Sequence, residues 1–235
     1  MTTRVGYLVS AALFACGLFH LLVFAVDGGP WEGPVSWRKP VTFGLSFGLT
    51  LATVVWVGTL VRITPFVVAL FTLASVYEVV GITVQAWRRV PSHFNNETPF
   101  DSAISTGLAA GGGVIIFSVV WLLVTAWRAD HLTPSLLLAV RVGAAAFLAA
   151  MAFGGLMIAR GAVLARTSGV AEAYGTAGIL KPAHGVAMHG VLVLPLLAWL
   201  LTFTALDERR RTRVVGWASA GYLALLAAAT WYSLA

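Results

Sequence analysis

The chain has 235 residues, of which 59% are hydrophobic and only 10% are charged, and its formal net charge is +6. Soluble domains carry roughly 25% charged residues, so this composition excludes an ordinary soluble protein and indicates a membrane protein. The positive charge does not indicate nucleic-acid binding, because the arginines stand at the ends of apolar runs, where they would meet lipid headgroups. The first expected partner is therefore the lipid bilayer.

Seven apolar runs follow one another along the chain, separated by segments rich in Pro and Gly such as "DGGPWEGP". Each is long enough to cross a bilayer, which needs about 20 helical residues at roughly 1.5 Å per residue. We therefore predict an all-α fold, a polytopic membrane bundle of seven transmembrane helices in a single domain. The predicted spans are residues 5–26, 41–61, 65–87, 103–126, 135–159, 183–205 and 214–234.

The connection between the sixth and seventh runs, "DERRRTR", contains four arginines. Cytoplasmic connections of membrane proteins carry an excess of Lys and Arg. With seven spans, Arg4, Arg62 and Arg128 lie on the same side as this connection. We therefore predict a multi-pass protein of the cell membrane with its N-terminus inside and its C-terminus outside.

The three long polar connections all leave the bundle on the predicted outer side. They are "DGGPWEGPVSWRKP", "RRVPSHFNNETPFD" and residues 160–181. Function concentrates on long loops that a rigid scaffold positions, so we expect an outward-facing polar pocket there. The alternative is a solvated loop in which Asn and Asp cap the fourth helix, since "TPFD" is typical of a helix start.

Three ionisable residues on three different runs lie at similar depth. His20 and His189 are about 9 Å and Glu78 about 14 Å below the predicted outer boundary. Such residues normally face the bundle interior, where they pair or bind something, although a lone His more often bonds to a neighbouring helix. His184 and His189 diverge by about 140° on a helix, so only one can join this layer. We predict His189, with His184 near the membrane interface.

Small and aromatic residues in the runs favour structural roles. Gly44 and Gly48 of the second run, and "AAGGGV" of the fourth, are typical of close helix packing. The single cysteine, Cys16, is expected to be a small buried hydrophobe. Tryptophans near the ends of the runs are expected to be interfacial anchors. They are Trp31, Trp37, Trp87, Trp127 and Trp199.

Three segments, "WRKPVTFGLSFGLT", "VQAWRRVPSHFNNETPFD" and "HGVAMHGVLVLP", resemble segments of a family of uncharacterised bacterial seven-helix membrane proteins, and together they cover about a fifth of the chain. The resemblance implies a bacterial cytoplasmic membrane and no particular reaction. Leu192 takes a place where other members carry Gln. The resemblance implies that the following residues are important: Lys39, Pro40, Glu78, Gln85, Ser92, His93, Asn95, Asp101, His184 and His189.

Three functions are compatible with these residues. The first is binding or transport of a small molecule or ion, in a pocket formed by Glu78, Gln85, His93, Asn95, Asp101, His184 and Lys39. The second is a membrane-embedded enzyme with zinc held by His20, His189 and Glu78, a ligand set that leaves a position open for water. The third is a b-type cytochrome with haem b between His20 and His189. The pocket ranks first, because it requires only polar residues around a cavity.

Overall fold

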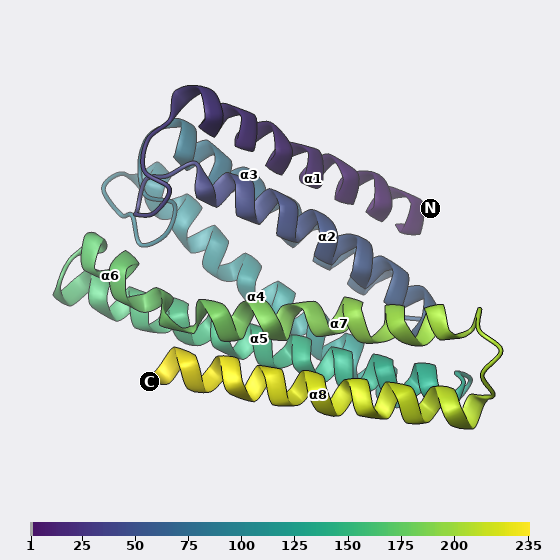
Figure 1. Ribbon diagram of the computed structural model, residues 1–235. Helices are drawn as coiled ribbons and strands as arrows, with labels where there is room; N and C mark the ends of the chain where they lie inside the picture. Colours follow the sequence, from purple (N-terminus) through teal and green to yellow (C-terminus); the bar gives the residue numbers. More distant parts are fainter. Residues whose placement is uncertain (1) are drawn as a thin grey trace. The chain divides into compact units, whose positions relative to one another are not determined.

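The computed structural model describes residues 2–235, and within this range it is helical without any strand (Figure 1). Seven spans are long and apolar enough to cross a membrane, which confirms the predicted all-α membrane bundle. A short helix and a 3-10 turn precede the sixth long helix. The elements are α1 Thr2–Asp27, α2 Arg38–Val61, α3 Pro65–Trp87, α4 Pro99–Trp127, α5 Pro134–Thr167, α6 Val170–Thr176, η1 Ala177–Leu180, α7 Lys181–Leu201 and α8 Glu208–Leu234.

Proline opens three of the long helices, with Pro65, Pro99 and Pro134 as the first residues of α3, α4 and α5. The fixed φ of proline suits the first helical turn, where its missing N–H would have no partner in any case. Helix α3 has the predicted bounds, and α1, α2 and α4 extend a few residues beyond the predicted runs.

The connection predicted at residues 160–181 is mostly helical, so the fifth helix does not end at residue 159 as predicted. Helix α5 continues to Thr167, because residues 160–167 are rich in good helix formers. It ends before Gly169, which adopts a left-handed φ of 96° and donates its amide to Leu164 O at 3.0 Å. Glycine is the residue that adopts this backbone conformation without strain, so the helix ends here.

The basic segment before the last span is also helical, although we expected a loop. Helix α7 already ends at Leu201, and α8 begins at Glu208. Asp207 caps α8, because its carboxylate accepts a hydrogen bond from the Arg210 amide at 2.8 Å. The arginines of "DERRRTR" therefore lie on the first turns of α8.

The contacts divide the chain into two compact units. Unit 1 comprises the chain up to Val55, Pro65–Ile115 and Met157–Gly178, and unit 2 comprises the remaining segments. Unit 1 thus contains the α1–α2 and α3–α4 connections and most of the third polar segment. Figure 1 shows the first two of these connections beside each other at the same end of α1, α2 and α3. The sequence correctly grouped these segments together.

Helices α1 and α2 of unit 1 approach each other at glycines. A Cβ atom added to Gly44 would lie 2.6 Å from the Gly17 Cα, and one added to Gly48 would lie 2.7 Å from the Phe14 backbone nitrogen. This confirms close packing at Gly44 and Gly48. In "AAGGGV", Gly111 is closely packed, with an added Cβ 2.9 Å from Glu78 Oε1, whereas Gly112 and Gly113 have nothing within 4 Å, so the expectation holds for Gly111 and was wrong for the other two.

Unit 2 is held by α5, α7 and α8. Ala139, Leu194, Ala198 and Val215 form one buried cluster. The Tyr222 hydroxyl of α8 donates to Val186 O of α7 at 2.5 Å. These contacts join α8 to α7 and α5.

Candidate functional site

The polar segments of unit 1 form a region that we call the polar cap, defined as residues 27–39, residues 88–101 and helix α6. Most of the predicted pocket residues lie in or against it. Four are in the cap itself and a fifth, on α3, bonds to it. They are Lys39, His93, Asn95, Asp101 and Gln85.

Asp101 is the centre of a closed hydrogen-bond network and only 1% exposed. Its carboxylate accepts hydrogen bonds from Gln85 Nε2 at 2.9 Å, from Thr98 Oγ1 at 2.6 Å and from the Arg88 guanidinium. Its own amide donates to Thr98 Oγ1 at 3.1 Å, so Thr98 caps α4. The predicted helix start at "TPFD" is confirmed, but the capping residue is Thr98 and not an Asp or Asn, and the network joins the end of α3 to the start of α4.

Lys39, His93 and Tyr174 form a second cluster. The Lys39 ammonium donates to Pro34 O at 2.7 Å and lies 3.6 Å from the centre of the Tyr174 ring. The Tyr174 hydroxyl accepts from the His93 amide at 2.8 Å and donates to the His93 carbonyl at 3.1 Å. Burial, together with the charge of Lys39, lowers the pKa of His93 from 6.5 to about 4. His93 is therefore neutral at pH 7.

Asn95 and Ser36 each contribute a buried polar atom without a hydrogen-bond partner in the described part of the chain, Asn95 Nδ2 and Ser36 Oγ. The other polar atom of the Asn95 side chain, Oδ1, accepts a hydrogen bond from the Glu97 amide at 3.1 Å. Buried polar groups are normally bonded. These two atoms can therefore bond to water or to a ligand.

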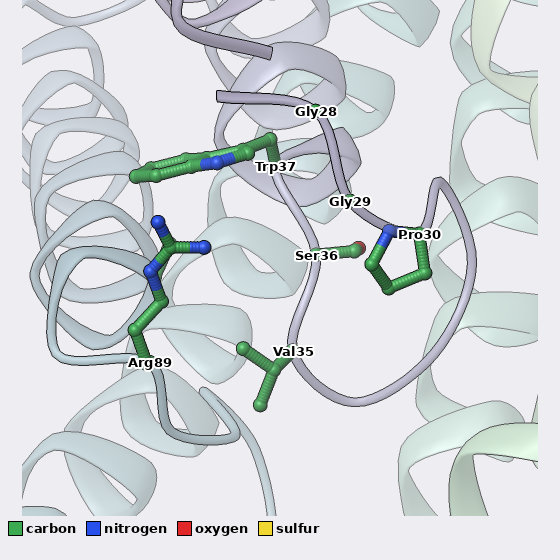
Figure 2. A pocket seen from close by; sticks show the side chains of 8 residues that line it. Gly28, Gly29, Pro30, Val35, Ser36, Trp37 and Arg89 are labelled. Atoms are coloured by element: carbon green, nitrogen blue, oxygen red, sulfur yellow. The ribbon is translucent and has the colours of Figure 1, made fainter.

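A third cluster surrounds Asp27 at the end of α1. Its carboxylate accepts from Trp37 Nε1 at 2.6 Å and from Arg89 Nη2 at 2.7 Å. The Arg89 guanidinium also lies 4.9 Å from the centre of the Trp37 ring, and Figure 2 shows it beneath the face of the indole. Trp37 is only 3% exposed, so the expectation that it is an interfacial anchor was wrong.

Arg89 and Trp37 line a small hollow in the cap (Figure 2). Its volume of about 20 Å³ is enough for one water molecule or for one ligand group of similar size, such as a single oxygen. Ser36 is also among its lining residues, and Figure 2 shows the Ser36 hydroxyl pointing toward Pro30. The full lining is Gly28, Gly29, Pro30, Val35, Ser36, Trp37, Ala86 and Arg89.

The backbone of Arg89 has a left-handed φ of 59°. It terminates α3, since its amide donates to Ala86 O at 3.0 Å and the Val90 amide donates to Gln85 O at 3.1 Å. Glycine usually occupies this position of a helix terminus, and another residue costs about 1 kcal/mol there. The strain places the guanidinium against Trp37 and the hollow.

His20 is buried, but both of its ring nitrogens are engaged. Nδ1 lies 2.8 Å from Cys16 O, and Nε2 accepts from Trp87 Nε1 at 3.0 Å. The carbonyl contact requires the proton on Nδ1. His20 thus has the structural role of joining α1 to α3, and neither nitrogen is left for zinc or haem iron.

His189 is exposed, with Nδ1 2.6 Å from Gly185 O of its own helix, so its predicted burial was wrong. His184 is the more buried of the pair and lies 2.7 Å from Ala150 O of α5. The buried stripe of α7 explains this, because Ala187 and Val191 lie on it, and His189 falls on the opposite side of the helix.

No three His, Cys, Asp or Glu side chains within residues 2–235 are arranged so that they could hold a metal ion. Of the predicted zinc ligands, His20 and Glu78 belong to unit 1 and His189 to unit 2. Glu78 is nevertheless buried in α3, with an exposure of 5%.

Sequence reasoning missed Ser36, Trp37, Arg89 and Tyr174 as parts of the site. Arg89 and Trp37 belong to segments quoted above, yet a basic or aromatic residue near a helix end most often meets the membrane interface. The left-handed turn at Arg89 gives no sequence signal, because glycine is the residue expected there.

No protein-family model, curated protein or solved structure matches the chain. Kinship with the bacterial seven-helix family stays a prediction.

Proposed function

We propose that this integral membrane protein binds an anionic group, a phosphate or carboxylate of a small molecule or lipid, in the hollow of the polar cap. The buried, unpaired Ser36 hydroxyl in a wall shared with the Arg89 guanidinium carries this proposal. The guanidinium only donates hydrogen bonds and its positive charge favours an anion, while the Ser36 hydroxyl can supply a further donor.

Arg89 has donors to spare for such a ligand. Asp27 takes only its Nη2 group, and a guanidinium carries five N–H donors. Its side chain is 57% exposed, so a ligand can reach it from the membrane surface. Because the hollow admits one water-sized group, an oxygen of the ligand enters it while the rest of the molecule lies outside.

The proposal also places the polar cap on the outer side of the membrane. We expect a cysteine at exposed Asn96 to react with an impermeant thiol reagent on intact cells, and one at exposed Ala205 to react only after lysis. Both variants carry Cys16→Ala, which removes the native thiol. Asn96 is preferred to its neighbour Asn95, which is buried. The reverse labelling pattern would put the cap in the cytoplasm.

Binding is tested with purified protein in nanodiscs of zwitterionic lipid, titrated with inorganic phosphate and acetate, and in nanodiscs that contain phosphatidylglycerol. Arg89→Gly is expected to weaken binding about 10-fold or more, because a hydrogen bond to a charged group contributes about 1.5–3 kcal/mol. It should not destabilise the helix end, since glycine suits the left-handed position. Ser36→Ala is expected to weaken binding about 3- to 10-fold.

Arg62→Gly is the matched control, because Arg62 has the same left-handed φ of 59° and the Ile63 amide bonds back to Gly58 O. It changes the backbone in the same way at a site without the hollow. Equal affinities of the Arg89→Gly and Arg62→Gly variants, or no binding of any probe by the parent protein, would contradict the proposal. Binding of phosphate and acetate indicates a soluble ligand, whereas stabilisation by phosphatidylglycerol alone indicates a lipid headgroup.

A further inference from the structure

Glu78 is a carboxylic acid within a membrane span. It stands nine residues before the end of α3 at Trp87, which corresponds to about 14 Å along the helix. Only 5% of the residue is exposed. A carboxyl group at this depth is costly, and residues of this kind usually serve a proton, an ion or a substrate.

The Glu78 carboxyl has neither a hydrogen bond nor an ion pair with any described residue. Asp101, on α4, has three donors around its carboxylate, so the two buried acids of unit 1 differ. A buried carboxylate without donors or a cation pays the whole cost of leaving water. Glu78 therefore needs a positive ligand.

The opposite wall of the site is the backbone of α4 at Gly111. A Cβ atom there would lie 2.9 Å from Glu78 Oε1, so the glycine leaves the room that the carboxyl occupies. No other titratable side chain follows Asp101 on α4. The neighbouring α1 offers Tyr7, Cys16 and His20 between its ends, and His20 is fully bonded elsewhere.

These surroundings select a proton among positive ligands. A metal cation needs several oxygen, nitrogen or sulfur ligands, and Glu78 belongs to no group of three His, Cys, Asp or Glu side chains in residues 2–235. A proton needs one lone pair of a carboxylate oxygen. Its uptake forms a single O–H bond, changes the charge from −1 to 0 and breaks no other bond in the protein.

We infer that Glu78, in the space left by Gly111, is a proton-binding site inside the membrane-spanning part of unit 1. The carboxyl holds a proton and releases it when the surroundings of α3 and α4 change. Proton relays of membrane pumps and transporters use intramembrane carboxyls of this kind. The inference does not depend on anion binding in the polar cap.

Infrared spectroscopy of the protein in lipid vesicles tests this assignment through the C=O stretching band of a protonated carboxylic acid. At neutral pH we expect this band in the parent protein, its loss in Glu78→Gln, and its retention in Glu97→Gln, which alters an exposed acid of the α3–α4 connection. An unchanged band in Glu78→Gln, or no band in the parent protein, would overturn the assignment.

Gly111→Ala supplies a second readout that keeps the acid in place. The added methyl group must displace the carboxyl, so we expect the band to shift. Gly112→Ala is the control on the same helix, because nothing lies within 4 Å of its Cβ position, and it should leave the band where it is. An unmoved band in Gly111→Ala would overturn the pairing of Glu78 with this glycine.

Discussion

Replacement of Gln85 by alanine is expected to lower the free energy of unfolding by about 3 to 5 kcal/mol. Gln85 is fully buried, donates to Asp101 at 2.9 Å and accepts from Arg88 at 2.5 Å. Each hydrogen bond to a charged group contributes about 1.5–3 kcal/mol, and the truncated side chain also leaves a cavity. The loss is measured by denaturant unfolding of the purified protein in detergent micelles.

Two further variants separate the causes. Gln85→Met keeps most of the side-chain volume but removes both hydrogen bonds. Its free energy of unfolding should therefore fall by most of the amount lost in Gln85→Ala. Asn96→Ala changes an exposed residue of the same connection and should stay within about 0.5 kcal/mol of the parent protein. A Gln85→Ala variant as stable as the Asn96→Ala control would show that the Asp101 network does not hold α3 to α4.

Gly44→Ala is expected to cost about 2 to 3 kcal/mol, because the new methyl group meets backbone and not a movable side chain. Its Cβ would lie 2.6 Å from both the Cα and the nitrogen of Gly17 and 3.0 Å from Leu13 O. Overpacking of this kind typically costs 1–3 kcal/mol, and here it is relieved only when α1 and α2 separate. The same unfolding measurement reports it.

Gly112→Ala is the matched control for Gly44→Ala, since it adds the same methyl group to a helical glycine with open space around it. We expect a change of no more than about 0.5 kcal/mol for this control. If both variants lost the same stability, helix propensity and not the contact of α1 with α2 would explain the effect.

Burial of single residues was the part that hydropathy predicted least well. Depth along a helix follows from counting residues, so His20, Glu78 and His189 were placed at similar depths. Which side of a helix faces its neighbours depends on the whole buried stripe. The stripe of α7 turns His189 outward, and a hydrogen bond from Trp87, 67 residues away in the chain, occupies His20.

The sequence by itself determined the class of the protein and most of its helix ends. Apolar runs of about 20 residues must become helices in a bilayer, because every backbone polar group then bonds within its own segment. Proline marks three helix starts for an equally local reason. These features depend on neighbouring residues, and they agree with the structure.

Only the tertiary structure decided what the polar residues do. Arg89 meets Asp27 across 62 residues, and His93 meets Tyr174 across 81. The buried Ser36 hydroxyl has no hydrogen-bond partner in the described part of the chain. A polar side chain in a membrane protein can be satisfied by water, backbone or a distant partner, and the choice follows from the packing of helices that are remote in the chain.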